Sequence, residues 1–208
     1  MSRFVGRANV AKRLAPLEGT SGRSVYAEGE ARFETEGGTV VARPSFPLRH
    51  TGEYPVVRVS PLLEEIAEDH RVGAVLVRLG GYAVGVFEGE RLVASKVGQR
   101  LVHGRHRAGG SSANRFRRRR EGQARVLVEA AAENGVYVLR PYRGRLQAVA
   151  LGGDRTAVRQ MLAASRELAQ IAATTTPRFL TVAEPRRHVL ERAIHDVYAV
   201  EIVTEAPS

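Results

Sequence analysis

The chain contains no cysteine, and this absence excludes both disulfide bonds and thiolate metal sites. No apolar run approaches the ~20 residues that a membrane-spanning helix needs, and the N-terminus shows no signal-peptide pattern. Lysine is nearly missing too, since only Lys12 and Lys96 are lysines among 32 Lys and Arg residues. These absences predict a cytoplasmic protein that does not bind membranes and whose positive charge is carried by arginine.

The charge that is present has one dominant sign. The formal net charge is +10 and the isoelectric point is about 10.9. A basic domain of this kind favours a polyanionic partner, most commonly nucleic acid. An arginine-rich, lysine-poor composition is also what a GC-rich genome produces, so composition alone leaves both explanations open.

Hydrophobic residues make up 43% of the 208 residues, which is enough to bury a core. Residues 1–60 are predicted to form an N-terminal appendage with a short helix near residues 5–14. A β-hairpin should follow, with Gly37 and Gly38 at its turn. Residues 61–208 are predicted to form the main domain.

The main domain begins with three β-rich runs, at residues 72–80, 82–89 and 91–102. Short glycine-containing turns separate them, so we expect a three-stranded antiparallel meander. A helix is predicted from about Arg115 to Asn134, ended by Gly135. Strands at 146–153, 178–184 and 197–203 should then alternate with helices that begin at Asp154 and Pro185. This order predicts an α/β fold, a mixed sheet with helices packed on it.

Positive charge is concentrated in one part of this domain. No Asp or Glu occurs between Arg91 and Arg120. Arginines at the start of a helix oppose the positive end of its dipole, unless an anion lies among them. We therefore predict that this segment binds RNA phosphates, although a solvated basic helix face would have the same sequence. The predicted RNA-binding residues are Lys96, Arg100, Arg105, Arg107, Arg115, Arg117, Arg118, Arg119 and Arg120.

A glycine pair, Gly109 and Gly110, precedes the arginines. Paired glycines allow the backbone to approach a partner closely, but they also occur in ordinary connectors. The sequence contains no P-loop, no GxGxxG, no HExxH and no GxSxG motif. It therefore predicts neither a cofactor nor a metal site.

Several segments together resemble a known family. They are GGYAVGVFEGERLVASKVGQRLVHGRHRAGG at 80–110, RFRRRREGQA at 115–124, LGGDR at 151–155 and FLTVAEPRRHVLERA at 179–193. This set is similar to the actinobacterial branch of the Vms-like release factors, which are relatives of the middle domain of eukaryotic and archaeal class-one release factors. The resemblance extends from about Val72 to the C-terminus.

The resemblance implies an RNase-H-like fold without nuclease activity. It also implies that the glycine loop reaches the peptidyl-transferase centre and promotes hydrolysis of the peptidyl-tRNA ester. The implied partners are the large ribosomal subunit, its rRNA and peptidyl-tRNA. The implied catalytic positions are Gly109, Gly110, Ser112, Ala113 and Asn114.

One position departs from the family pattern. Family loops carry a glutamine that positions water, and Ala113 occupies that place here. The backbone N–H of Ala113 can still stabilise an oxyanion, or the carboxamide of Asn114 can replace the glutamine after a one-residue shift. The sequence thus leaves two functions open: a peptidyl-tRNA hydrolase, with full or reduced activity, and a non-catalytic ribosome- or RNA-binding factor of the hibernation or stress type.

Overall fold

The computed structural model describes residues 2–78, 80–99, 112–176 and 178–207. It divides into two compact units, one formed by residues 1–69 together with 195–208 and the other by residues 70–194. The division therefore falls nine residues after the boundary expected at residue 60. It also places the C-terminal segment, which was expected in the main domain, in the first unit.

The first unit is a six-stranded antiparallel sheet with two short α-helices. The expected hairpin is present, but its turn is formed by Glu36 and Gly37, and Gly38 is the first residue of the second strand. The apolar core includes Leu14, Phe33 and Leu62, which are fully buried. The strand order is β1 (Ser2–Val5), β10 (Val200–Glu205), β4 (Gly38–Arg43), β3 (Glu30–Thr35), β2 (Arg23–Ala27) and β5 (Gly52–Tyr54), and the helices are α1 (Arg7–Leu14), η1 (Ala15–Leu17) and α2 (Ser60–Ile66).

The C-terminal strand β10 is the main correction to the predicted topology. It was expected in the mixed sheet of the second domain, but it pairs antiparallel with β1 on one side and β4 on the other. Its Val200 and Ile202 are buried in the core of the first unit. An alternating strand of this kind fits any sheet with an apolar face, so local sequence could not choose between the two sheets.

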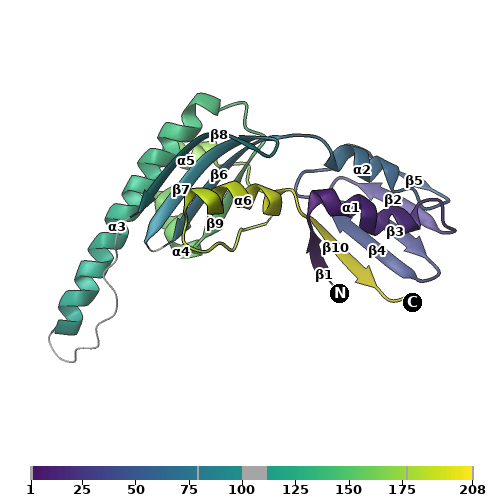
Figure 1. The fold of residues 1–208 in the computed structure, drawn as a ribbon, viewed down its shortest axis with the longest axis horizontal. Coiled ribbons are helices and arrows are strands. Elements are labelled where there is room, and N and C mark those ends of the chain that lie inside the picture. Colours follow the sequence, from purple (N-terminus) through teal and green to yellow (C-terminus); the bar gives the residue numbers. More distant parts are fainter. Residues whose placement is uncertain (1, 79, 100–111, 177, 208) are drawn as a thin grey trace. The chain divides into compact units, whose positions relative to one another are not determined.

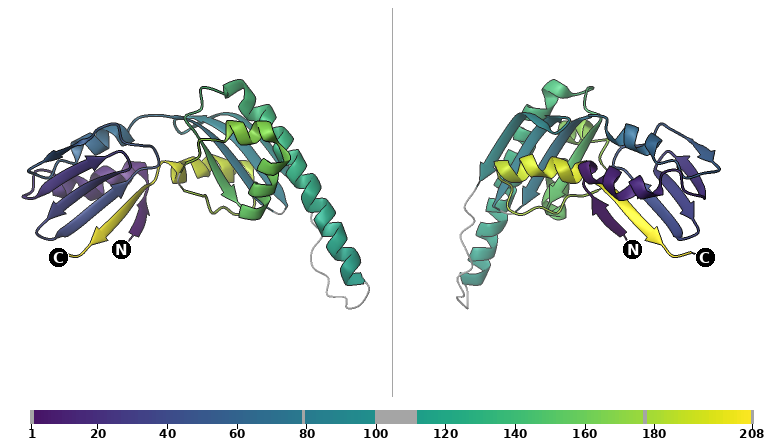
Figure 2. Two further views of the ribbon diagram at one scale, coloured as in Figure 1. Left: turned by 180° about the vertical axis from the view of Figure 1, so that it is seen from behind. Right: turned by 45° about the vertical axis from the view of Figure 1, so that its right-hand side comes forward.

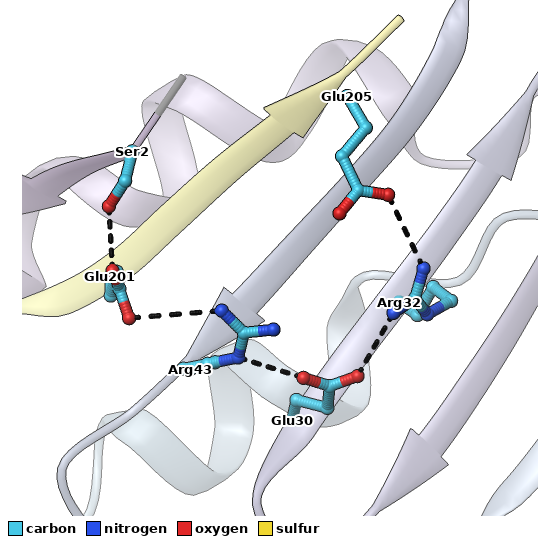
Figure 3. Close-up of polar contacts among 6 residues, drawn as sticks. All are labelled: Ser2, Glu30, Arg32, Arg43, Glu201 and Glu205. Carbon is cyan, nitrogen blue, oxygen red and sulfur yellow. Dashed lines mark hydrogen bonds and ion pairs between the residues drawn. The ribbon is translucent and has the colours of Figure 1, made fainter. Parts of the chain in front are cut away.

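Charged side chains link β10 to its neighbours on the other face of this sheet (Figure 3). Arg43 binds Glu30 at 2.8 Å and lies 3.9 Å from Glu201 of β10. Arg32 in turn lies 3.6 Å from Glu205 at the end of β10. Exposed ion pairs contribute at most about 1 kcal/mol each, so the burial of Val200 and Ile202 dominates the attachment of this strand.

The second unit contains a four-stranded sheet whose order is β8 (Arg91–Gln99), β7 (Gly81–Glu88), β6 (Arg71–Arg78) and β9 (Ala148–Gly153). The three strands β6, β7 and β8 are antiparallel, which confirms the predicted meander. Strand β9 joins β6 in parallel after a helical crossover. The expected mixed α/β architecture is therefore confirmed.

Helices cover both faces of this sheet. The helices α3 (Ser112–Leu139), α4 (Arg155–Ala164) and α5 (Arg166–Ile171) lie on one face, and α6 (Arg187–Val197) crosses the other (Figures 1 and 2). Residues Val75 and Val84 share a core with α3, whereas Gly85 approaches Leu190 of α6. Burial on both faces explains why β6 and β7 are almost continuously apolar.

The segment after β9 confirms one prediction and contradicts another. Asp154 caps α4 as expected, because its carboxylate accepts a hydrogen bond of 2.8 Å from the N–H of Ala157. The predicted strand at 178–184 was wrong, since only a single bridge between Leu180 and Gly152 forms there. The helix that begins after Asp154 ends at Ala164, because Ser165 is extended and caps the separate helix α5.

Helix α3 is longer than predicted at both ends. It begins at Ser112 rather than near Arg115, and it continues through Gly135 to Leu139, where a short 3₁₀ turn, η2 (Arg140–Tyr142), follows. A Cβ at Gly135 would lie 2.9 Å from the Cδ2 atom of Leu168. The glycine thus permits close packing of α5 on α3, and it does not end the helix.

Candidate nucleic-acid interface

Helix α3 has a packed half and a projecting half (Figure 2). Among its described side chains, the first that is buried is Leu127, and Val128, Ala131 and Ala132 follow it into the core. The segment 112–126 precedes all of them and spans roughly 22 Å at 1.5 Å per residue. The helix therefore carries its N-terminal end well beyond the sheet of the second unit.

The packed half is fixed to the sheet by a hydrogen bond between two side chains, which the sequence did not predict. The side-chain amide of Asn134 donates a 2.8 Å hydrogen bond to the hydroxyl of Tyr82 on β7, and it also bonds the carbonyl of Ala130. Burial raises the pKa of the Tyr82 phenol, and the hydrogen bond from Asn134 opposes part of that rise. No local signal pairs these residues, because they are distant in the chain and meet only when α3 packs on β7.

The N-terminal end of α3 corrects the position of three candidate catalytic residues. Ser112, Ala113 and Asn114 were expected in a loop, but their backbone forms the first turn of the helix. The first four N–H groups of any α-helix have no partner within the helix. Together with the macrodipole, they make this end of α3 attractive to an anion or to a developing oxyanion.

Two of the predicted basic residues have described side chains, and both are exposed. Arg118 lies on the projecting half of α3. Lys96 lies on the edge strand β8 opposite Val84, on the face of the sheet that α3 covers. Neither has an ion-pair partner in the described part of the chain.

The remaining candidates cannot be placed to the same extent. Gly109, Gly110, Arg100, Arg105 and Arg107 lie outside the described residues. Of the rest, only the helical backbone is described, and this group consists of Ser112, Ala113, Asn114, Arg115, Arg117, Arg119 and Arg120.

Arginines elsewhere in the second unit contrast with this segment. Arg140 forms two hydrogen bonds of 2.7 Å to Glu167, and Arg187 pairs with Glu191 at 2.9 Å. Arg71 and Arg91 both bind Glu88 at 2.6 Å. Between Arg91 and Arg120 the sequence offers no carboxylate at all. Several described arginines of the unit are therefore paired with acids, whereas residues 92–120 contain no acid of their own.

Other kinds of site find no support in the described residues. Within them, no three His, Cys, Asp or Glu side chains gather closely enough to hold a metal ion. None of the helices formed by those residues combines the length and apolarity needed to cross a membrane.

Comparison with known proteins gives a family match over much of the chain. A family model described as "Actinobacteria/chloroflexi VLRF1 release factor" matches residues 70–203, which is more than half of the chain. The peptide chain release factor subunit 1 of Archaeoglobus fulgidus is 30% identical over 95 residues. That match covers 46% of this chain and 23% of the archaeal protein.

Solved structures show more distant likenesses. The archaeal translation termination factor aRF1 matches with a TM-score of 0.46 and 20% identity, over 93% of this chain and 55% of that one. The Vms1 mitochondrial localization core matches with a TM-score of 0.41 and 10% identity, over 96% of this chain and 82% of that one. The chain thus spans about half the length of the solved archaeal factor aRF1.

Proposed function

Because the chain belongs to the Actinobacteria/chloroflexi VLRF1 release factor family, we propose that it promotes hydrolysis of peptidyl-tRNA on the large ribosomal subunit. The family assignment supports a role in translation termination or rescue. We further propose that the substrate is peptidyl-tRNA and that the chain acts in the cytoplasm. The observation that carries it is the projecting half of α3, whose first turn, with N–H groups that have no partner within the helix, lies inside the arginine-rich segment without acids.

The proposed chemistry is ester hydrolysis. Water attacks the carbonyl carbon that joins the nascent peptide to the tRNA ribose, an oxyanion forms, and the bond to the ribose oxygen breaks with transfer of a proton to that oxygen. A backbone N–H of Gly109 or Gly110, or of Ala113 in the first turn, would donate to the oxyanion. The arginines would bind the surrounding RNA phosphates and so position the start of α3 next to the ester.

The identity of residue 113 favours a second candidate function. Alanine has no group that can orient water, and loss of one positioning group typically lowers a rate by about 100- to 1000-fold. A chain that binds the same ribosomal cavity without cleaving the ester, for instance during stress, is the alternative. Ribosome binding is common to both candidates, and ester cleavage separates them.

The first experiment separates cleavage from binding. Purified protein is incubated with large subunits that carry labelled peptidyl-tRNA, and released peptide and bound protein are both measured. Release above background supports the hydrolase, and binding without release supports the alternative. Ala113→Gln should raise the rate of release. Loss of release in Asn114→Ala, with no effect of Ala113→Gln, would show that Asn114 takes the glutamine's role.

A second experiment tests the arginines. Replacing Arg117, Arg118, Arg119 and Arg120 with Gln should lower the slope of log affinity against log salt by roughly 3, because each phosphate contact contributes ~0.7–0.9 to that slope. A matched control replaces four exposed arginines from other places with Gln, namely Arg13, Arg159, Arg166 and Arg192. Equal changes in the two variants would mean that net charge, and not the projecting half of α3, governs ribosome binding.

A further inference from the structure

The packed half of α3 borders a groove that the proposed reaction does not use. The groove has a volume of about 450 Å³ and lies where α3 meets the junction of α4 and α5. Its size falls in the range of ligand-binding clefts. We call it the acidic groove, and it is lined by Glu129, Ala132, Glu133, Val136, Tyr137, Arg140, Ala164 and Ser165.

Small side chains at a break between two helices account for the hollow. Helix α4 ends at Ala164, and Ser165 is extended, with its hydroxyl turned to the N–H of Leu168 to cap α5. Ala132 on α3 is 3% exposed and Val136 is partly buried, so both belong to the apolar core beneath the groove. The groove therefore combines an apolar floor with a polar rim.

The rim carries two exposed carboxylates, those of Glu129 and Glu133. Arg140, the groove's only arginine among its lining residues, is occupied by its two hydrogen bonds to Glu167, which lower the pKa of that carboxyl. Glu129 has only a loose contact of 3.8 Å with Arg125, and both side chains are largely exposed. Glu133 has no ion-pair partner in the part of the chain described by the structure. Carboxylates at this rim repel phosphate and attract a cation.

An aromatic side chain completes the site. Tyr137 lies on the rim and is 75% exposed, which is high for a large aromatic residue. It follows Glu133 by four positions on α3, so the two side chains are neighbours on the helix surface. A cation held by Glu133 can therefore also contact the face of the Tyr137 ring.

We propose that the acidic groove binds a basic segment of a protein partner through an arginine side chain. The guanidinium group pairs with Glu129 and Glu133 and stacks on Tyr137, while its methylene stem packs over Ala132 and Val136. Residue 133 lies roughly 30 Å along α3 from Ser112. The groove can thus be occupied while the N-terminal end of the helix is engaged elsewhere.

The test uses the full chain labelled with ¹⁵N and needs no ribosomes. A capped arginine-leucine-arginine peptide is titrated at low salt, and chemical shifts are followed by NMR. We expect saturable shifts at the groove and none with a glutamate-leucine-glutamate peptide. Shifts confined to other surfaces, or equal binding of the acidic peptide, would overturn the proposal. Because no ribosome is present, failure here leaves the proposed hydrolase untouched, and failure of the release assay leaves the groove untouched.

Matched variants assign the binding to these residues. Glu129→Gln combined with Glu133→Gln should weaken the peptide at least tenfold, and Tyr137→Ala at least threefold. The control combines Glu36→Gln with Glu64→Gln, which changes net charge equally at two exposed sites of the first unit, and it should bind within twofold of the parent. Equal weakening by the control would refute a local site.

Sedimentation at increasing protein concentration tests a different occupant. Self-association that disappears in the Glu129 and Glu133 double variant would show that the groove holds a second copy of this chain, and would overturn the proposal of a separate partner. A monomer at all concentrations, with peptide bound, supports it.

Discussion

Helix α3 contains two glycines in opposite surroundings, and alanine should affect them in opposite ways. A Cβ at Gly122 meets no atom within 4 Å, whereas a Cβ at Gly135 lies 2.9 Å from the Cδ2 and 3.1 Å from the Cδ1 of Leu168. Replacing glycine by alanine inside a helix raises the free energy of unfolding by about 1 kcal/mol, because alanine loses less backbone entropy on folding. Gly122→Ala should receive this gain without a steric cost.

Gly135→Ala receives the same gain but also overpacks the core. Leu168 is 0% exposed, so its methyl groups cannot turn into solvent to make room. Overpacking of a dense core costs about 1–3 kcal/mol. The net change in the free energy of unfolding should therefore lie between about zero and a loss of 2 kcal/mol, and the two variants should differ by roughly 1–3 kcal/mol.

Two measurements are needed because Gly122 precedes the first buried side chain of the helix. Hydrogen exchange should show about fivefold greater amide protection along residues 118–126 in Gly122→Ala, since 1.4 kcal/mol corresponds to a factor of ten. Thermal unfolding should show no rise in Tm for Gly135→Ala. If Gly135→Ala raised the Tm by the ~2–4 °C that 1 kcal/mol gives a domain of this size, the close approach of α5 to α3 would be refuted.

Three further predictions concern single residues. Asn134→Ala should destabilise the second unit by about 1 kcal/mol, because it leaves the partly buried hydroxyl of Tyr82 without its donor; chemical denaturation checks this, with Tyr82→Phe as the milder control. Asp154→Ala should cost about 1 kcal/mol through loss of the α4 cap, and Asp154→Ser should restore most of it in the same assay. The free energy of unfolding should fall as the pH rises above about 10. Burial raises the pKa of Tyr26 in the folded chain, whereas a tyrosine in the unfolded chain ionises near pH 10. The folded state then binds more protons than the unfolded state, and Tyr26→Phe should flatten the decline; an unchanged slope would contradict this assignment.

Helix α3 illustrates how far local rules reach. The sequence correctly predicts a helix after the glycine pair, but the expectation that Gly135 ends this helix was wrong. Gly135 lies inside the helix, where its missing side chain makes room for Leu168. The start at Ser112 was also missed, because the helix was expected to begin with the arginines near Arg115. The candidate site changed accordingly, with Ala113 and Asn114 moving from a loop to the first turn of the helix.

The sequence by itself determined the meander of β6, β7 and β8, the Asp154 cap and the acid-free arginine segment. All of these depend on neighbouring residues, through alternation, turn chemistry or charge. Only the tertiary structure decided that β10 joins the first sheet, that Asn134 meets Tyr82, and that Glu133 and Tyr137 border a groove. Each of these depends on which apolar face packs against which. That choice is made by the total area buried between distant segments, and no short stretch of sequence encodes it.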